Sequence, residues 1–431
     1  MALTALLVLG LVFAGLLFLG VPVAFCIGLA SVATMLLSIA VAPSVTTIAQ
    51  QMATGLDSFA LLAIPFFILA GQLMNRGGIA SRLVRFAKSI IGMVPGGLAH
   101  VNVVAAMLMG AVSGSAVAAA SAVGGFMGPQ MEKEGYDKNF GAAVNITSAT
   151  TGLLIPPSNI LIVYSLASGG LSIGALFLAG YVPGIVVGLS LMAVAAVWAY
   201  RADYPTGKTH GLGTVFGRFL RALPSLLMLV VVIGGIVAGI FTATEAAAVA
   251  VFYALVLAFA YREIGVDDLP DILLETVRST SIVMLLIGTS IAMSWVLSYD
   301  HLPQQISAAL LGLTDSTVLI LLSINLILLV VGTFMDMTPA VLIFTPIFLP
   351  VVTELGMDPI HFGIMLVLNL CVGLCTPPVG TVLFVGAAVA DTTIEDLVKP
   401  LLPLFLAMVV ALLFVTFMPE LSLWLPRVFG F

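Results

Sequence analysis

Long apolar stretches separated by short polar segments run through the whole chain of 431 residues. Apolar stretches of about 20 residues are long enough to cross the hydrocarbon core of a membrane as helices. The pattern therefore predicts an all-α polytopic membrane protein. The predicted membrane segments are 3–20, 22–42, 57–75, 97–127, 140–168, 173–200, 217–240, 243–261, 276–298, 317–352, 361–389 and 397–418.

Two of these segments, 97–127 and 317–352, are too long for one simple crossing and carry polar residues in the middle. The letters "SGSA" interrupt the first at 113–116, and "MDMTP" interrupts the second at 335–339. Each is therefore predicted to be a re-entrant hairpin, which enters and leaves the membrane on the same side. The other ten segments are predicted to be full crossings.

The distribution of basic residues supports the two hairpins. With the N-terminus outside and both hairpins re-entrant, 13 of the 14 Lys and Arg residues fall in inside loops, and only Arg427 falls outside. The inside residues are Arg76, Arg82, Arg85, Lys88, Lys133, Lys138, Arg201, Lys208, Arg218, Arg221, Arg262, Arg278 and Lys399. Because Lys and Arg are in excess on the cytoplasmic side, this orientation is the expected one.

A double proline interrupts two of the predicted crossings, and Pro156 and Pro377, the first of each pair, are 221 residues apart. Other residues match at a spacing of 221 or 222. The matches pair Gly110 with Gly332, Glu132 with Glu354, Asp137 with Asp358, and Phe140-Gly141 with Phe362-Gly363. This ordered series predicts an internal repeat, with one copy in 1–205 and the second in 206–431.

Each copy contains five crossings, one of them broken, and one hairpin. Because five is odd, the second copy enters the membrane from the opposite side, so the repeats have inverted topology. The first contains hairpin 97–127 and broken helix 140–168, and the second contains hairpin 317–352 and broken helix 361–389. Such repeats place binding sites near the middle of the membrane. There the freed carbonyls can coordinate a cation, and the helix N-terminus after each double proline can bind an anion.

Composition excludes several other kinds of protein. The chain is 61% hydrophobic and 8% charged, and it carries no basic patch of the kind that binds nucleic acid. Its three cysteines lack the spacing of a transition-metal site. No Gly-x-x-x-x-Gly-Lys-Ser/Thr motif occurs, so direct ATP drive would need another chain.

Asp336 is the strongest candidate for a binding residue, because a carboxylate inside the membrane is costly and usually functional. Its alternative role is to cap the following half-helix. The other candidates lie at the hairpin tips and helix breaks. The predicted sodium-binding residues are Ser113, Gly114, Ser115, Ser148, Thr151, Gly152, Thr333, Asp336, Thr338, Gly373 and Thr376. The predicted substrate-binding residues are Ser115, Ser158, Asn159, Asp336 and Gly380.

Each of these groups also has a purely structural alternative. A side-chain hydroxyl can bond back to a helical carbonyl. The side-chain amide of Asn145, which precedes the first break, can do the same. Gly114 can simply permit close helix packing. Glu245 follows Thr242 at the spacing of a capping box, and we expect it to be structural. The predicted ligands are hydroxyls, carbonyls and one carboxylate, which suit a bound cation better than a proton relay. This ligand set favours Na⁺ as the coupling ion, and no other cofactor is expected.

Five motifs resemble the large membrane subunit of tripartite ATP-independent periplasmic (TRAP) transporters. They are "LLAIPFFILAG" at 61–71, "SGSAVA" at 113–118, "GIFTATEAAAVA" at 239–250, "MDMTP" at 335–339 and "GLCTPPVG" at 373–380. The resemblance implies an elevator-type, sodium-coupled importer of organic acids in the bacterial inner membrane, with a periplasmic N-terminus. It also implies a small four-helix membrane subunit and a periplasmic substrate-binding protein as partners. The basic region Arg76–Lys88 would form an amphipathic arm helix at the inner surface.

Two alternatives to this interpretation stay open. The chain could be a stand-alone sodium–dicarboxylate symporter of related architecture, which would need no binding protein. It could also be a passive channel or a scaffold subunit. An enzyme is not expected, because an intramembrane hydrolase would need a Ser/His pair or paired carboxylates, and no histidine lies near the predicted midplane serines.

Overall fold

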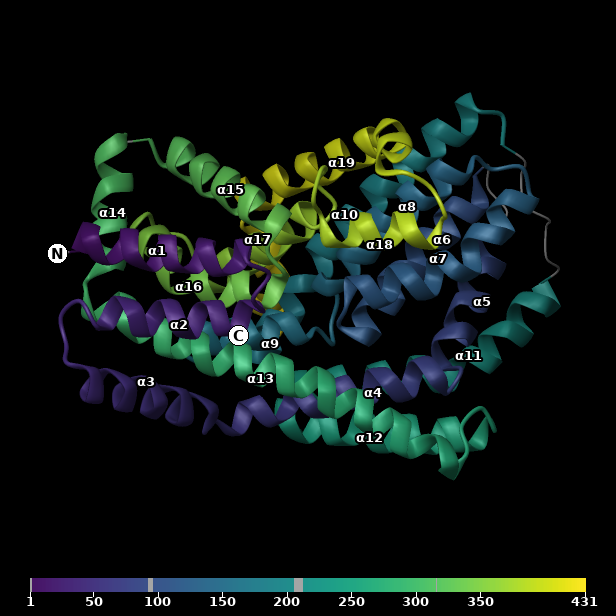
Figure 1. Cartoon of the computed structure of the whole chain (residues 1–431). Coiled ribbons are helices and arrows are strands. Elements are labelled where there is room, and N and C mark those ends of the chain that lie inside the picture. The colour runs from purple at the N-terminus through teal and green to yellow at the C-terminus, as the bar shows by residue number, and fades with distance from the viewer. Residues whose placement is uncertain (1, 92–95, 205–211, 315) are drawn as a thin grey trace.

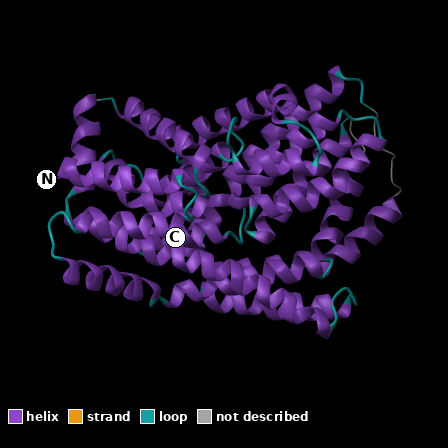
Figure 2. Cartoon of the chain, in the orientation of Figure 1, coloured by secondary structure: helices purple, strands orange, loops and turns teal. Residues whose placement is uncertain are grey.

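The computed structural model describes residues 2–91, 96–204, 212–314 and 316–431, and in these ranges every regular element is a helix (Figures 1 and 2). The α-helices are α1 (Ala2–Phe18), α2 (Val23–Met35), α3 (Val41–Leu56), α4 (Ala63–Arg76), α5 (Ile79–Ile91), α6 (Gly97–Ser113), α7 (Ala116–Lys133), α8 (Lys138–Thr151), α9 (Asn159–Ala167), α10 (Ile173–Arg201), α11 (Leu212–Val237), α12 (Ala243–Ala260), α13 (Leu269–Tyr299), α14 (Leu302–Leu313), α15 (Thr317–Phe334), α16 (Met337–Glu354), α17 (Pro359–Gly373), α18 (Thr381–Val389), α19 (Ile394–Phe417) and α20 (Glu420–Val428). Short 3₁₀ helices are η1 (Phe59–Leu62), η2 (Gly152–Leu154) and η3 (Val266–Asp268).

Two helical hairpins approach the centre of the molecule from opposite ends. Helices α6 and α7 meet at Gly114, which has a left-handed backbone (φ 63°) that glycine adopts without strain. Helices α15 and α16 meet at Met335 and Asp336. In Figure 1 the first pair lies in the right half of the view and the second in the left half. Both reversals fall inside the polar interruptions at 113–116 and 335–339.

Each double proline lies between two half-helices. Helix α8 and η2 end at Leu154, α9 begins at Asn159, and the two parts are bent by 49°. Helix α17 ends at Gly373, and α18 begins at Thr381. Proline lacks the N–H that an uninterrupted helix would need, which accounts for both breaks. The two prolines of each pair are joined by a cis peptide bond.

The matched acidic residues Asp137 and Asp358 play the same local part. The Asp137 carboxylate accepts a hydrogen bond from the backbone N–H of Phe140 at 2.8 Å, and that of Asp358 accepts one from Ile360 at 2.8 Å. Both residues are the N-caps of the first half-helix of a broken helix, α8 and α17. The carboxylates satisfy N–H groups that a helix start leaves free.

Matched glycines bring each hairpin against the broken helix that follows it. A Cβ on Gly110 would lie 2.8 Å from the Gly152 Cα, and a Cβ on Gly373 would lie 2.6 Å from the Gly332 Cα. Real carbon atoms make contact at about 3.5–4.0 Å, so only glycine permits these two backbone crossings. The second arm of each hairpin packs on the other broken helix, α7 on α18 and α16 on α9.

The predicted crossings need correction near the N-terminus. Eight helices in the described ranges are long and apolar enough to cross a membrane, and the bent pair α8–α9 makes a possible ninth. Helices α1 and α2, with 17 and 13 residues, are shorter. The predicted crossing 22–42 is wrong at its C-terminal end, because α2 stops at Met35 and a separate helix, α3, follows. The apolar pattern continues through this break, and Pro43 fits the first turn of α3, where its missing N–H costs nothing.

Other elements add to the predicted pattern. Helices α14 and α20 were not predicted, whereas α5 covers most of the predicted basic arm. The Arg82 guanidinium of α5 lies 3.6 Å from the centre of the Tyr261 ring and donates to the Gly78 carbonyl at 2.8 Å. Lys208 and the boundary between the predicted repeats at 205–206 lie outside the described residues.

Candidate functional site

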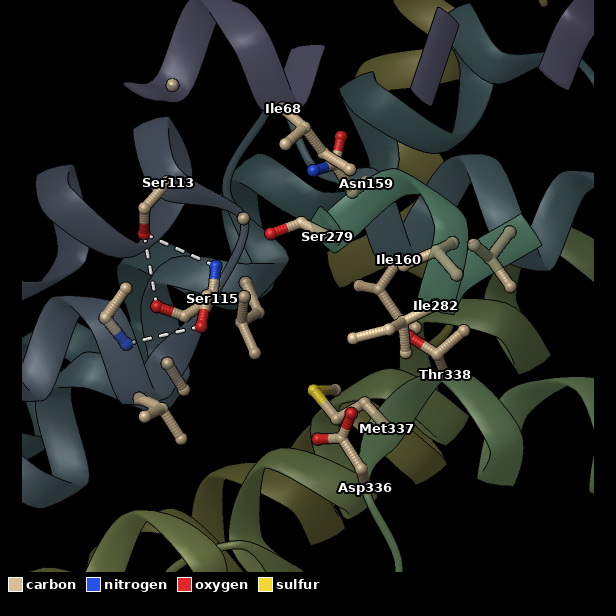
Figure 3. Close-up of a pocket in the computed structure, with 18 of the residues that line it drawn as sticks. Ile68, Ser113, Ser115, Asn159, Ile160, Ser279, Ile282, Asp336, Met337 and Thr338 are labelled. Atoms are coloured by element: carbon tan, nitrogen blue, oxygen red, sulfur yellow. Dashed lines mark hydrogen bonds between the residues drawn. The ribbon is translucent and has the colours of Figure 1, made fainter. Parts of the chain in front are cut away.

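A cavity of about 450 Å³ lies at the point where the two hairpin tips face each other (Figure 3). Its walls come from both tips, from the first residues of α9 and α18, and from α4 and α13. Six predicted site residues line it. They are Ser113, Gly114, Ser115, Asn159, Asp336 and Thr338. The fold thus brings together groups that are more than 200 residues apart in the sequence.

The first tip is held in shape by its own hydroxyl groups. The Ser113 hydroxyl donates to the Ser115 carbonyl at 3.1 Å and accepts from the Ser115 N–H at 3.3 Å. The Ser115 hydroxyl caps α7 by accepting from the backbone N–H of Ala118 at 3.2 Å. A Cβ on Gly114 would lie 3.1 Å from the side-chain amide carbon of Asn159, so the tip lies directly against the start of α9.

Asp336 carries the single charge at the second tip. It is the N-cap of α16, and its carboxylate points into the cavity (Figure 3). Among the described residues that line the cavity, no other side chain is charged. Thr338 follows in the first turn of α16 and lines the same wall. The Asp336 carboxylate is therefore placed to interact with a ligand or an ion bound in the cavity.

Four helices begin at this cavity. The first residues of α7, α9, α16 and α18, which are Ala116, Asn159, Met337 and Thr381, all line it. The first N–H groups of a helix lack partners inside the helix, and the helix dipole places partial positive charge there. Helices α9, α16 and α18 have no side-chain cap hydrogen bond, so the Asp336 carboxylate does not fill the capping role that was its alternative. The Ser158 hydroxyl, placed where it could cap α9, instead donates to the Leu153 carbonyl at 2.5 Å. The arrangement favours an anion.

The remaining predicted residues do not line the cavity and lie in or beside the two broken helices. Four of their hydroxyls donate back to a carbonyl one turn earlier. These are Ser148 to Val144 at 2.5 Å, Thr151 to Thr147 at 3.2 Å, Thr333 to Leu329 at 3.0 Å and Thr376 to Val372 at 2.9 Å. Gly152 and Gly373 form the close backbone crossings, and Gly380 lies against the Leu374 carbonyl. Their predicted roles in binding stay predictions.

Four polar residues that line the cavity were not predicted. Gln72 and Asn75 come from α4, Ser279 from α13 and Thr381 from α18. The Asn75 side-chain oxygen and the Thr381 hydroxyl are buried and have no hydrogen-bond partner among the described residues. The side-chain amides of Gln72 and Asn75 near the end of an apolar helix could have been selected from the sequence as candidate binding groups. Ser279 follows Arg278 and reads as part of a helix end, so the sequence pattern gave no reason to select it.

Two other predictions can be compared with the geometry. Thr242 and Glu245 form the predicted capping box, in which the Glu245 carboxylate accepts from the Thr242 N–H at 2.8 Å and the Thr242 hydroxyl accepts from the Glu245 N–H at 3.3 Å. Among the described residues, no group of three or more His, Cys, Asp or Glu side chains could hold a metal ion.

Residues 10–421 match the family model of the DctM component of tripartite ATP-independent periplasmic transporters. The chain belongs to this family. It is 54% identical over 418 residues to the uncharacterised protein YgiK of Salmonella typhimurium, which covers 97% of this chain and 96% of that protein. It is 39% identical over 414 residues to the isethionate TRAP transporter permease DctMQ of Oleidesulfovibrio alaskensis, covering 96% of this chain and 65% of that protein.

A third relative matches over its full length. The C4-dicarboxylate TRAP transporter large permease DctM of Rhodobacter capsulatus is 37% identical over 441 residues, which covers 99% of this chain and 100% of that protein. The fold of this TRAP permease also resembles that of the YdaH transporter of Alcanivorax borkumensis, with a TM-score of 0.63 and 16% identity over 88% of this chain and 89% of that one. TRAP large permeases are multi-pass membrane proteins that work with a substrate-binding protein and a small permease subunit.

Proposed function

We propose that this TRAP large permease imports an organic acid together with Na⁺ through the bacterial inner membrane by an elevator mechanism. The observation that carries the proposal is the meeting of four helix N-termini and one carboxylate, Asp336, in a single cavity. Helix N-termini favour a bound anion. The names of two relatives, which refer to isethionate and to C4-dicarboxylates, support an anionic substrate.

Charge balance is the argument for a coupling cation. A carboxylate-bearing substrate would share the cavity with the Asp336 carboxylate, and no Lys or Arg lines the described part of that cavity. Like charges at close range disfavour each other strongly when water is excluded. A cation bound at the tips would offset this repulsion. Binding of the acid would then depend on the cation, which is the basis of symport.

The predicted sodium ligands form two groups, one near each pair of crossing glycines. Gly110 and Gly152 hold the first tip near the first break, and Gly332 and Gly373 hold the second tip near the second break. We assign one Na⁺ to each group. Hydroxyls such as those of Thr151 and Thr376, which donate to helix carbonyls, still have lone pairs for a cation. Oxygen ligands of this kind suit a hard cation.

The elevator assignment rests on the division of the helices into two packed groups. The two hairpins and two broken helices pack on one another through α7 with α18 and α16 with α9, so they can move as one body. Helices α2, α3, α4, α12 and α13 pack among themselves as a second layer, which we assign as the scaffold (Figure 1). The N-terminus is periplasmic in this proposal. The partners are a small four-helix membrane subunit and a periplasmic substrate-binding protein.

Thermal unfolding of the purified chain in NaCl and in choline chloride tests the ion. A ligand at about 100 times its Kd stabilises the folded state by roughly 2.7 kcal/mol. We expect a higher midpoint in NaCl for the wild type, and a smaller difference between the salts for Asp336→Asn and Ser115→Ala. Asp271→Asn, which removes an exposed carboxylate far from the tips in sequence, is the control and should keep the full sodium effect.

Uptake by proteoliposomes tests the coupling itself. The chain would be reconstituted with its small subunit and binding protein, and uptake of a C4-dicarboxylate and of isethionate followed with an inward sodium gradient. We expect accumulation that requires both the gradient and the binding protein. Accumulation without the binding protein would instead indicate a stand-alone symporter, and flux that ignores the gradient would indicate a channel.

A further inference from the structure

A second cavity of about 170 Å³ lies at the open end of the first hairpin, away from the two tips. It lies between α6, α7, α8 and α18, whose labels gather in the right half of Figure 1. None of the residues predicted to bind sodium or substrate lines this cavity. Its polar groups therefore need an explanation of their own.

Two almost fully buried asparagines line this inner cavity. Asn102 is 1% exposed and Asn145 is 2% exposed. The Asn145 side-chain nitrogen donates to the Ala120 carbonyl at 2.7 Å, and that of Asn102 donates to the Gly141 carbonyl at 3.4 Å. A carbonyl can only accept, so each amide must present its NH₂ group there and its oxygen elsewhere.

Both side-chain oxygens are then left buried with no hydrogen-bond partner among the described residues. A buried acceptor without a partner costs about 1–3 kcal/mol. Two such acceptors beside one cavity indicate that the cavity holds something that interacts with oxygen lone pairs. Water and a metal cation are the two candidates.

The charges around the cavity favour a cation. Glu132, Lys138 and Asp391 line it. The Lys138 ammonium donates to the Asp391 carbonyl at 2.8 Å and lies 3.8 Å from the Asp391 carboxylate, so these two charges offset each other. Glu132 has no ion-pair partner among the described residues. One net carboxylate with two amide oxygens is a hard, weakly charged ligand set that suits a monovalent cation, since Ca²⁺ sites normally recruit several carboxylates.

Two glycines of α7 leave room for the cavity and for the Asn145 side chain. A Cβ on Gly124 of α7 would lie 2.6 Å from the Asn145 side-chain nitrogen, so a glycine is needed for Asn145 to reach the Ala120 carbonyl. Gly128, one turn further along α7, lines the cavity and has open space where its Cβ would be. The hairpin is thus built to leave room beside the two amides.

We propose that this cavity is an inner binding site for a monovalent cation, formed by the side-chain oxygens of Asn102 and Asn145 with the Glu132 carboxylate. It lies at the open end of the first hairpin, where α7 ends at Lys133 and α8 begins at Lys138. If the proposed function is correct, that end is cytoplasmic, and the site is where a cation released from the tip is held before it leaves the protein.

Thiol modification at Gly128 tests this site. Gly128→Cys would place a thiol on the cavity wall, whereas the three natural cysteines are buried. Inside-out vesicles would be treated with a small membrane-impermeant thiosulfonate in NaCl, KCl or choline chloride. We expect modification to be about tenfold slower when Na⁺ or K⁺ is at about ten times its Kd. Gly125→Cys is the matched control, because Gly125 lies one turn away on α7 with open space and does not line the cavity.

Two further variants separate a cation from water. Asn145→Leu and, at the exposed rim, Glu132→Gln should each remove the protection by salt while the new thiol at position 128 stays reactive. Equal rates of modification in all three salts would mean that the cavity holds water only, and the inference would be wrong. Protection that persists in both variants would also overturn it.

The outcome is distinguishable from failure of the proposed function. Salt protection at Gly128→Cys without sodium-dependent uptake would keep the inner site and reject the symporter. Sodium-dependent uptake with no salt protection would do the reverse. Modification from the outside face only would overturn the role of the site in inward release.

Discussion

The two glycine crossings give a prediction whose size can be worked from the structure. A Cβ on Gly373 would lie 2.6 Å from the Gly332 Cα, whereas a Cβ on Gly332 would lie 3.2 Å from the Gly373 Cα. Against a contact distance of about 3.5 Å, the first overlaps a backbone atom by about 1 Å and the second by about 0.3 Å. Backbone atoms in a buried crossing cannot move aside without separating α15 from α17.

The two alanine variants should therefore differ. Overpacking of a buried site costs about 1–3 kcal/mol, and we expect Gly373→Ala to fall at the upper end of this range. For Gly332→Ala the smaller overlap is partly offset by the gain of about 0.5–1 kcal/mol that alanine brings to a helix interior. Gly125→Ala, with open space around it, is the matched control and should keep or raise the stability.

The assay is thermal unfolding in detergent, followed with a thiol-reactive fluorophore. Cys26, Cys371 and Cys375 are all buried, so the signal rises only when the bundle opens. The expected order of midpoints is Gly125→Ala highest, then Gly332→Ala, then Gly373→Ala. Equal midpoints for Gly332→Ala and Gly373→Ala would refute the reasoning, because the difference in overlap would then have no energetic consequence.

Two more contacts can be tested by the same assay. Tyr164→Phe removes the hydrogen bond that the buried Tyr164 hydroxyl donates to the Pro359 carbonyl at 2.5 Å, and it should lower the free energy of unfolding by about 0.5–1.5 kcal/mol. Tyr181→Phe is the control, because the described residues show no hydrogen bond that it would lose. Arg82→Gln removes the guanidinium that lies 3.6 Å from the Tyr261 ring centre and should cost about 0.5–1 kcal/mol; an unchanged midpoint would mean that this contact does not hold α5 to the end of α12.

The hairpins and helix breaks were predictable from sequence because their signals are local. A run of Ser-Gly-Ser or Met-Asp-Met-Thr-Pro inside an apolar stretch, or a double proline, interrupts a helix wherever it occurs. The structure places breaks at these points, before Ala116 and Met337 and between α8 and α9 and between α17 and α18. Gly110 and Gly332, which match in sequence, each lie in a backbone crossing that needs glycine.

The end of α2 and the walls of the cavity were not predictable in the same way. The residues from Leu36 to Ala40 are mostly apolar, so hydropathy alone runs through the turn that separates α2 from α3. The cavity residues Asn75 and Ser279 come from two helices that meet the tips only in three dimensions. A single sequence shows which residues are polar, but not which side of a helix faces the tips.

The division of the cavity between its walls bears on how the protein could move. All four helix N-termini and the Asp336 carboxylate belong to the hairpins and broken helices, whereas α4 and α13 contribute uncharged polar and apolar side chains such as Gln72, Ser279 and Ile68. In an elevator the substrate travels with one body and exchanges its contacts with the other. The strong, charge-dependent interactions must then lie on the moving body, and the contacts with the scaffold must be weak enough to break on each passage. An ion held between the tips fits this division, because it would travel with the groups proposed to bind the acid and would keep their charges balanced at every position.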